Sequence, residues 1–359
     1  MVRRDEPIVL ECPHCGGDVS PGDFQCKGAT CNRRFRSLLG IPDLRIAQDA
    51  AVDYDEDWAL ACSLAEAYPK ASFQDLLGRL WQARVRRDLV TQERAEMRMA
   101  QIQRTRLKHT EELDPRGWLG KLVPTDARTR VLDLGCGPGG FLLPAGRVFG
   151  EAAGIDISMA WLVICRKRLE NERIPAVLAC ACAERLPFRH DTFDLVIAFD
   201  TLEHVADRER MVREAHRVVR PGRIVVCTTP NRFSLSAEPH YRVWGVGLLP
   251  RTWMGRYVRW RTGQEFRFTY PLSVMDLRRL FARHFTAGCR ILVPELWAED
   301  ISSFRPLKRF AARLYNLSTR LKVSRAALTF VAPFFRLVAR KTDAGAAYKS
   351  QRRAREVAS

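Results

Sequence analysis

The pattern of apolar and polar positions changes at Arg130, where short apolar runs begin to alternate with helical stretches. Helical patterns such as MAWLVICRKRLENE and DRERMVREAHRVVR separate consecutive runs. Strands that alternate with helices favour a parallel, doubly wound α/β sheet of the Rossmann-like kind. The five runs expected to form strands lie in RVLDLGCGPGG, AAGIDIS, AVLACACA, TFDLVIAFD and RIVVCTTPN.

Two further apolar runs, AGCRILVPE (287–295) and FFRLVARK (334–341), are expected to be the last strands, which brings the sheet to seven. The amphipathic segment SFRPLKRFAARLYNLSTRL lies between them. The residues before the sheet are polar and follow a loosely helical period, which predicts one or two helices that cover the mouth of the sheet domain.

These patterns predict four parts and one insertion. We expect a zinc ribbon at 1–45, a helical lead segment at 46–125, a sheet domain at 126–341 and a disordered basic tail at 342–359. An insertion at 232–261 is rich in Trp, Tyr and Arg and follows the fifth strand. Ligands of such sheets bind at the carboxyl edge of the strands, so the insertion is the expected substrate lid.

Four cysteines cluster near the N-terminus in CPHCGGDVSPGDFQCKGATC. Two close cysteine pairs are typical of a zinc ribbon, in which four thiolates hold a tetrahedral ion and replace a core too small to fold alone. The second pair has four intervening residues rather than two, so a ribbon that has lost its metal is the alternative. His14 is expected to be a bystander. The predicted zinc ligands are Cys12, Cys15, Cys26 and Cys31.

The other seven of the eleven cysteines are scattered through apolar segments. The first residues contain no apolar signal-peptide segment, and no run is long enough to span a bilayer. Disulfide scaffolds belong to small secreted proteins, so these cysteines are expected to be reduced core residues. The expected location is the cytoplasm, with the inner face of the membrane as an option.

The net charge of +18 comes almost entirely from the last third of the chain. Residues 231–359 contain 25 basic and 8 acidic side chains, and no acidic residue lies between Ile301 and Thr342. Such a region suits an anionic surface, either nucleic acid or membrane lipid. An arginine-rich solvated face accounts for the same composition equally well.

A glycine-rich turn, DLGCGPGG, follows the first strand of the sheet domain. Glycines there let the backbone turn tightly and approach a ligand with no side chain in the way. Asp133 precedes the turn, and Asp156 ends the next strand, where its carboxylate can accept hydrogen bonds from two ribose hydroxyls. A glycine-rich turn alone is weak evidence for a cofactor site, but both acids and the alternating strands make it strong.

At these residues the sequence resembles the class I S-adenosylmethionine-dependent methyltransferases, closely over 126–231 and more loosely over 262–341. The resemblance implies that the turn wraps the methionine part of S-adenosylmethionine and that Asp156 binds the ribose. Cys182 stands where the family commonly has an aspartate that contacts the adenine amino group, so weaker adenine contacts are expected. The implied cofactor-binding residues are Asp133, Gly135, Cys136, Gly137, Gly139, Asp156, Ile157, Cys182, Ala183 and Asp200.

The stretch FDTLEHV places Asp200, Glu203 and His204 directly after the fourth strand. Asp200 is expected to cap a following helix, so that all three side chains share one helix face. The pattern resembles the ExxEHV of ubiquinone-biosynthesis O-methyltransferases and of small-RNA 2′-O-methyltransferases. In those enzymes the acids and the histidine hold a divalent ion that helps to ionise a substrate hydroxyl.

Methyl transfer to oxygen needs a deprotonated hydroxyl, which a neutral histidine or a bound metal ion can provide. We favour His204 as a general base; a divalent ion such as Mg²⁺ at the three residues and a purely structural role are the alternatives. Glu238 and His240 of the insertion could reach the same centre, although a turn satisfied by its own backbone explains them as well.

Two functions from different classes are compatible with these features. The first is O-methylation of a hydroxylated small molecule, lipid-like or glycosylated, with the amphipathic segment on an anionic membrane surface or buried in the core. The second is methylation of RNA gripped by the ribbon and the basic third, and nucleic acid is the less favoured partner. A ribbon that docks a partner protein is compatible with both, and the sequence leaves the oligomeric state open.

Overall fold

The computed structural model describes residues 6–46, 52–86, 91–124, 126–266, 269–286, 288–302 and 304–342. The expected basic tail lies outside the described residues from residue 343 onward. The chain divides into two compact units, which comprise Met1–Ile197 with Arg213–Arg223, and Ala198–Val212 with Ile224–Ser359. They are called unit 1 and unit 2 below.

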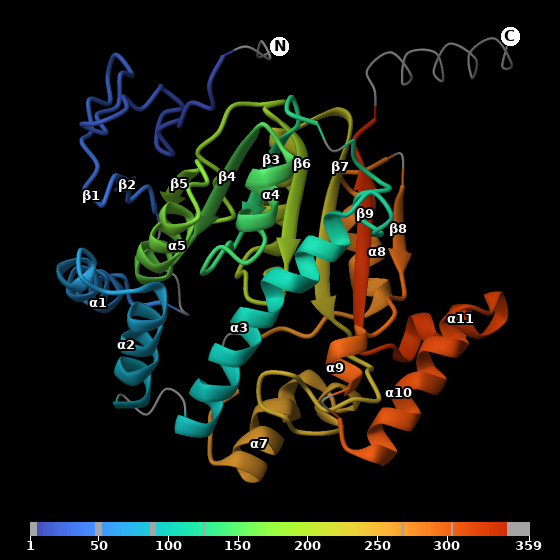
Figure 1. The fold of residues 1–359 in the computed structure, drawn as a ribbon. Coiled ribbons are helices and arrows are strands. Elements are labelled where there is room, and N and C mark those ends of the chain that lie inside the picture. The colour runs from blue at the N-terminus through green and yellow to red at the C-terminus, as the bar shows by residue number, and fades with distance from the viewer. Residues whose placement is uncertain are drawn as a thin grey trace, which may run out of the picture. The chain divides into compact units, whose positions relative to one another are not determined.

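A seven-stranded sheet runs in the order β5-β4-β3-β6-β7-β9-β8, which confirms the Rossmann-like α/β fold (Figure 1). Strands β3, β4, β5 and β6 are parallel, as expected. Strand β9 instead runs antiparallel to both β7 and β8, so the sheet is mixed. The strands are β3 (Arg130–Leu134), β4 (Glu151–Asp156), β5 (Val177–Cys180), β6 (Phe193–Phe199), β7 (Val219–Pro230), β8 (Cys289–Leu292) and β9 (Phe334–Arg340).

The strands of unit 1 form a core that is buried on both faces. Every residue of β3 is buried, and β4 and β5 each leave only their first residue partly exposed. Helices α4 (Leu142–Val148) and α5 (Met159–Asn171) pack against this sheet, and α6 (Arg208–Val218) precedes β7. The predicted helices after the second strand and before the fifth are confirmed.

The lead segment forms three helices rather than one or two: α1 (Tyr54–Ala67), α2 (Phe73–Arg86) and α3 (Gln92–Leu113). Helix-capping residues help to explain why separate helices form in this segment. Asp53 caps α1 and Thr91 caps α3 with side-chain oxygens that accept from the first backbone N–H groups. Helices α1 and α2 pack on α5, and α3 packs on α4. Within the described ranges, no helix has both the length and the apolar content to cross a membrane.

The ribbon segment of unit 1 contains the short antiparallel pair β1 (Ser37–Leu38) and β2 (Ile41–Pro42). It is attached to the sheet domain by main-chain pairing, since Leu10 pairs with Phe188 and Asp43 pairs with Cys180 at the end of β5. The ribbon is therefore continuous with the end of the sheet that carries the predicted cofactor residues.

Unit 2 contains the insertion and the helices that follow it. The insertion forms a small core of its own from Val243, Val246, Met254 and Val258. Its elements are a 3₁₀ turn, η1 (Val246–Leu248), and α7 (Arg251–Thr262). The later helices are α8 (Val274–Ala282), α9 (Ala298–Ser302), α10 (Pro306–Thr319) and α11 (Lys322–Val331).

Candidate functional site

The four N-terminal cysteines converge on one point. One ligand atom from each lies within 4.8 Å of the others, and the Sγ atoms of Cys15 and Cys26 are 3.4 Å apart. The backbone N–H of Gly17 donates to Cys15 Sγ at 3.4 Å, and that of Gly28 donates to Cys26 Sγ at 3.3 Å. His14 is not part of the cluster. Four sulfurs with backbone donors aimed at them fit a tetrahedral zinc ion.

The thiols of this cluster shift in opposite directions. Burial raises the pKa of the Cys12 thiol and raises that of Cys26 to about 12, whereas the Gly17 N–H lowers the pKa of Cys15. A close approach at Gly28 also belongs to the site, because a Cβ there would lie 2.8 Å from Cys15 Sγ. Cys12, Cys15, Cys26 and Cys31 are thus brought together as the sequence predicted.

The predicted cofactor turn is built around Asp156, at the carboxyl end of β4. Its carboxylate accepts a hydrogen bond of 2.9 Å from the N–H of Gly137 and another of 2.9 Å from the N–H of Ser158. These two bonds fix the orientation of both oxygens, and each oxygen retains a lone pair for a ligand hydroxyl. The parallel pairing of β3 with β4 places Asp133 beside Gly154, two residues before Asp156.

Two glycines shape the turn between Asp133 and α4. Gly137 has a φ of 48°, and a Cβ added there would meet no atom within 4 Å, so open space lies next to the backbone. Gly139 has a φ of 73°, and its Cβ would lie 2.8 Å from Cys165 Sγ. The first glycine leaves room for a ligand and the second allows α5 to approach closely.

Both carboxylates of this site are shielded from water. Burial, and after it the charge of Asp156, raises the pKa of Asp133 to about 8. Burial also raises the pKa of Asp156 to about 6, although the N–H donors of Ser158 and Gly137 lower it. Buried carboxyls of this kind favour a cationic or hydroxyl-bearing ligand, because such a ligand replaces the lost hydration. The α-ammonium and ribose of S-adenosylmethionine fit these requirements.

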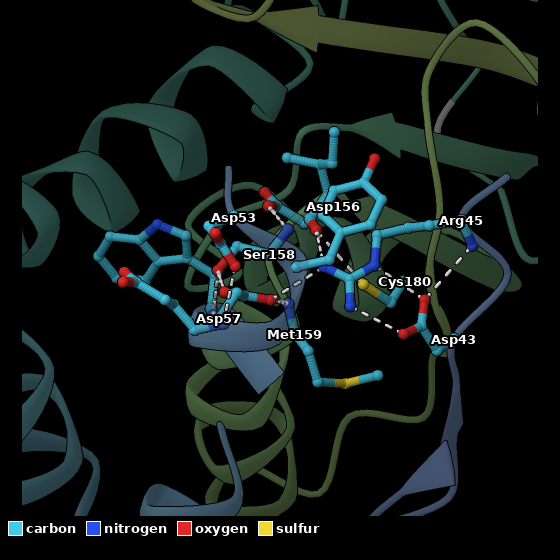
Figure 2. A network of polar contacts seen from close by, with 12 residues as sticks. Asp43, Arg45, Asp53, Asp57, Asp156, Ser158, Met159 and Cys180 are labelled. Atoms are coloured by element: carbon cyan, nitrogen blue, oxygen red, sulfur yellow. Dashed lines mark hydrogen bonds and ion pairs between the residues drawn. The ribbon is translucent and has the colours of Figure 1, made fainter. Parts of the chain in front are cut away.

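A polar network not predicted from the sequence surrounds Asp156 and the loop that follows it (Figure 2). Asp57 of α1 accepts from Ser158 Oγ at 2.5 Å and from the N–H of Met159 at 2.7 Å. The Arg45 guanidinium donates to Asp57 at 3.1 Å and to the carbonyl of Ile157 at 3.0 Å. The lead segment and the end of the ribbon therefore hold the loop that follows Asp156.

Cys182 and Ala183, predicted to border the adenine, follow the end of β5 within the same unit. The Tyr54 hydroxyl lies 3.5 Å from Cys182 Sγ, and the Arg45 guanidinium lies 4.1 Å from the centre of the Tyr54 ring. Tyr54 thus stands next to the position where the family commonly carries an acid. Sequence spacing gives no signal for this, since Tyr54 and Cys182 are separated by 128 residues.

The predicted arrangement of Asp200, Glu203 and His204 is wrong in its local structure. Residues 201–204 form a turn, and α6 begins only at Arg208. Asp200 has a φ of 51° and accepts a hydrogen bond of 2.9 Å from Thr228 Oγ1 instead of capping a helix. The helix cap is Asp207, whose carboxylate accepts from the N–H of Arg210.

A different trio gathers in unit 2. Glu203, His204 and His240 each offer one ligand atom, and these atoms lie within 4.8 Å of one another. The two imidazole rings meet edge to face with their centres 4.8 Å apart. Asp200 is not part of this cluster, whereas His240, which the sequence suggested as a second contributor, is.

Glu203 is the buried member of the cluster, at 1% exposure. Its Oε2 accepts from Thr229 Oγ1 at 3.0 Å, while Oε1 has no hydrogen-bond partner among the described residues. Burial first, and then the charge of Asp200, raises the pKa of Glu203 well above its ordinary range. A buried carboxylate oxygen beside two imidazoles is an arrangement that a divalent ion would satisfy.

Glu238 supports the cluster from the insertion. Its Oε1 lies 2.6 Å from His240 Nδ1, and its Oε2 accepts from the N–H of Tyr241 at 2.6 Å. A carboxylate on one ring nitrogen fixes the tautomer and the orientation of the imidazole. The insertion contributes to a pocket within unit 2. This pocket is lined by Glu203, Pro230, Asn231, Arg232, Ser234, Ser236, Ala237, Glu238, Pro239, Gly245, Val246, Gly247, Thr269 and Pro271.

Comparison with known proteins finds similarity in the central part of the chain. Residues 132–227 match the family model described as a methyltransferase domain. A ubiquinone biosynthesis O-methyltransferase of Ruegeria pomeroyi is 29% identical over 153 residues, which are 43% of this chain and 59% of the relative. One from Rhizobium etli is 34% identical over 103 residues, 29% of this chain and 42% of the relative. The similarity thus spans about half the length of these relatives.

Solved structures give a weaker comparison. An S-adenosylmethionine-dependent methyltransferase of Mesorhizobium loti has a TM-score of 0.44 at 20% identity, over 62% of this chain and 96% of that one. Phosphoethanolamine N-methyltransferase 2 of Haemonchus contortus has a TM-score of 0.41 at 17% identity, over 65% and 56%. These scores are too low to assign the fold, which rests on the strand order itself.

Proposed function

We propose that this chain is a class I S-adenosylmethionine-dependent methyltransferase that methylates an oxygen atom of a hydroxylated small molecule. The observation that carries the proposal is the Asp156 carboxylate, which two backbone N–H groups orient beside the open backbone of Gly137. The matched methyltransferase domain covers both residues. The names of the O-methyltransferase relatives support oxygen as the acceptor atom.

The cofactor supplies an electrophilic methyl group, and the residues of unit 1 bind and orient it. Asp133, Gly135, Cys136, Gly137 and Gly139 hold the methionine part. Asp156 binds the ribose hydroxyls, and Ile157, Cys182 and Ala183 border the adenine. Tyr54 joins this set, because its hydroxyl lies beside Cys182.

The cluster in unit 2 supplies the acceptor chemistry. A hydroxyl placed at Glu203, His204 and His240 can lose its proton to a neutral imidazole, since an imidazole titrates near neutral pH. Alternatively, these three residues would hold a divalent ion, which would lower the pKa of a substrate hydroxyl. One carboxylate and two imidazoles suit Mn²⁺ or Zn²⁺ better than Mg²⁺, which prefers oxygen ligands.

The RNA alternative has less support. Two of the arginines next to the ribbon are engaged within unit 1: Arg189 Nη2 donates to Asp18 at 2.6 Å and Arg185 donates to the carbonyl of Pro13 at 3.1 Å. The basic surplus of the chain lies in residues 231–359, at the other end from the ribbon. The ribbon is therefore proposed to hold a structural zinc ion rather than to grip phosphates.

The proposal is tested by following the methyl group. Purified protein is incubated with methyl-labelled S-adenosylmethionine and a host extract, which is then separated into lipid, soluble metabolite, RNA and protein. We expect the label in a lipid or metabolite fraction. Hydriodic acid should release it as methyl iodide, as expected of a methyl ether, and the Asp156→Ala variant should not incorporate it. Label confined to RNA or protein, or label on nitrogen, would refute O-methylation of a small molecule.

A further inference from the structure

Helix α10 carries an apolar stripe that the fold leaves uncovered. Leu307, Phe310, Leu314, Leu317 and Leu321 follow one another at alternating spacings of three and four residues, which puts them on one face of the helix and its end. All five are between 54% and 82% exposed. The alternative that this stripe is buried in the core is therefore wrong for the described residues.

The opposite face fixes the helix on unit 2. Ala312 and Thr319 are buried. The Tyr315 hydroxyl donates to the carbonyl of Pro294 at 2.9 Å, and the Asn316 amide exchanges two hydrogen bonds with the backbone of Leu296. Because these contacts set the rotation of α10, the exposure of the stripe is a consequence of the packing and not of a loosely attached helix.

Basic side chains flank the stripe. Arg305, Lys308, Arg309, Arg313 and Arg320 all lie on or next to α10, and no acidic residue lies between Ile301 and Thr342. Arg309 and Lys308 are held close to the start of the helix, where Arg309 donates to the carbonyl of Phe304 and Lys308 lies 4.0 Å from the Phe304 ring centre. The apolar stripe is thus flanked by positively charged side chains.

Helix α7 of the same unit adds a second exposed apolar feature. Trp253 and Trp260 are largely exposed, and Arg256, Arg259 and Arg261 lie on the same helix. In Figure 1, α7 and α10 both lie below the strands, beyond the carboxyl end of β7 and the adjacent amino end of β9. Tryptophan and arginine are the side chains that favour the boundary between headgroups and acyl chains.

We propose that α10 lies in the surface of an anionic lipid bilayer, with its leucine stripe among the acyl chains and its arginines among the headgroup phosphates. Charge complementarity selects this occupant. Pairing of the stripe with a second copy would bring Arg313 and Arg320 of one helix against those of the other. Nucleic acid would satisfy the arginines but would leave the leucines and Phe310 in water. Together with the proposed function, on which this step rests, the surface predicts an acceptor that is dissolved in the membrane.

Vesicle flotation tests the surface directly. The full chain is mixed with vesicles of phosphatidylcholine alone or with added phosphatidylglycerol. We expect flotation with the anionic vesicles, little with the neutral ones, and a loss of binding when salt is raised from about 0.1 M to about 1 M, because the Debye length falls from ~10 Å to ~3 Å. Equal flotation with both, or none with either, would overturn the proposal.

Matched variants assign the binding to α10. Leu314→Gln should lower the vesicle partition coefficient about 5–10-fold, since it removes an inserted side chain. Leu107→Gln, at a leucine of similar exposure on α3, should leave it unchanged. Arg313→Gln should cost about 5-fold, as expected for one headgroup charge, and Arg79→Gln on α2 nothing. Equal effects of the paired variants would refute the assignment.

Two other readouts keep the outcomes distinct. A dimer in sedimentation that Leu314→Gln dissociates, or tight binding of transfer RNA that the same variant abolishes, would replace the membrane with another partner. S-adenosylhomocysteine binding should be the same in wild type and all four variants. If it is, a failure of flotation overturns the membrane surface alone; if the wild type does not bind it at all, the proposed function fails whatever the vesicles show.

Discussion

The smallest features of the proposed cofactor site are two buried acids, Asp133 and Asp156. A carboxylate at Asp133 or Asp156 loses hydration on folding, and the result is a pKa of about 8 for the first and about 6 for the second. Part of the binding energy of a cationic ligand would therefore be used to ionise Asp133. This gives the site a pH signature that an ordinary exposed acid lacks.

Binding of S-adenosylhomocysteine should release a proton at about pH 7, because Asp133 is mostly protonated without the ligand and ionised beside its α-ammonium group. Affinity should rise as pH rises through ~6 to ~8 and then level off, which is the direction expected for a raised carboxyl pKa. Calorimetry in buffers of different ionisation enthalpy measures the released proton. Asp133→Asn should abolish the release; proton uptake by the wild type would contradict the assignment.

Chelation and substitutions at the cluster in unit 2 distinguish a metal site from a general base. If Glu203, His204 and His240 hold a divalent ion, chelation should abolish methyl transfer, added Mn²⁺ or Zn²⁺ should restore it, and Glu203→Gln should harm as much as His240→Ala. If His204 is the base, chelation has no effect and His204→Ala alone costs ~10²–10⁴ in rate. Glu209→Gln is the matched control. Rates within a few-fold of wild type for all variants would give the cluster a structural role.

At this scale the sequence predicted residues better than their arrangement. The positions of Asp133 and Asp156 beside the glycine turn were predictable, because strand ends and glycines mark them locally. The trio after β6 was not, because Asp207 takes the cap and Asp200 adopts a left-handed turn. Tyr54 escaped prediction because its contact with Cys182 forms only when α1 packs on α5.

Among the elements, the ribbon and α1 support the site from outside the sheet. The lead segment was predicted to cover the mouth of the domain, and its first helix does contact the loop after β4 through Asp57. Periodicity indicated that helices exist there, but their number depended on caps at Asp53 and Thr91. The reversed direction of β9, between β7 and β8, could not be predicted either, since the alternation of helices and strands does not specify the direction of each strand.

The network around α1 should matter for both stability and the cofactor. Asp57→Asn removes the charge that Ser158, Met159 and Arg45 share, and should lower the free energy of unfolding by about 1–3 kcal/mol. It should also weaken S-adenosylhomocysteine binding, since Ser158 helps to hold Asp156. Asp55→Asn, on the exposed first turn of the same helix, is the control for both. Thermal and chemical denaturation with calorimetry decide; equal effects of the two changes would leave the network without this role.

The ribbon should contain about one zinc ion per chain, held by four thiolates. Elemental analysis of the purified protein measures it, and Cys26→Ser should remove the metal and lower the melting temperature. Cys289→Ser, outside the cluster, should do neither. A folded, metal-free protein whose four cysteines stay reduced would show that the ribbon has lost its ion.

For the molecule as a whole, the two units carry different chemistry. Unit 1 contains the cysteine cluster and the proposed cofactor residues other than Asp200. Unit 2 contains Asp200, the Glu203 cluster, the insertion and most of the excess positive charge. The composition alone located that charge in the last third of the chain. It could not show that the α10 stripe stays exposed, because an amphipathic pattern is the same for a helix that faces a core or a membrane.

Calorimetric titration of S-adenosylhomocysteine into the wild type and Asp156→Ala tests the central claim most directly. Loss of the carboxylate leaves two ribose hydroxyls without their acceptor, which should weaken binding by about 1–3 kcal/mol, or roughly 5–150-fold. Asp191→Ala, at an aspartate outside the site, is the control and should bind as the wild type does. No binding by the wild type, or tight binding that Asp156→Ala leaves unchanged, would contradict the assignment of this chain as a methyltransferase.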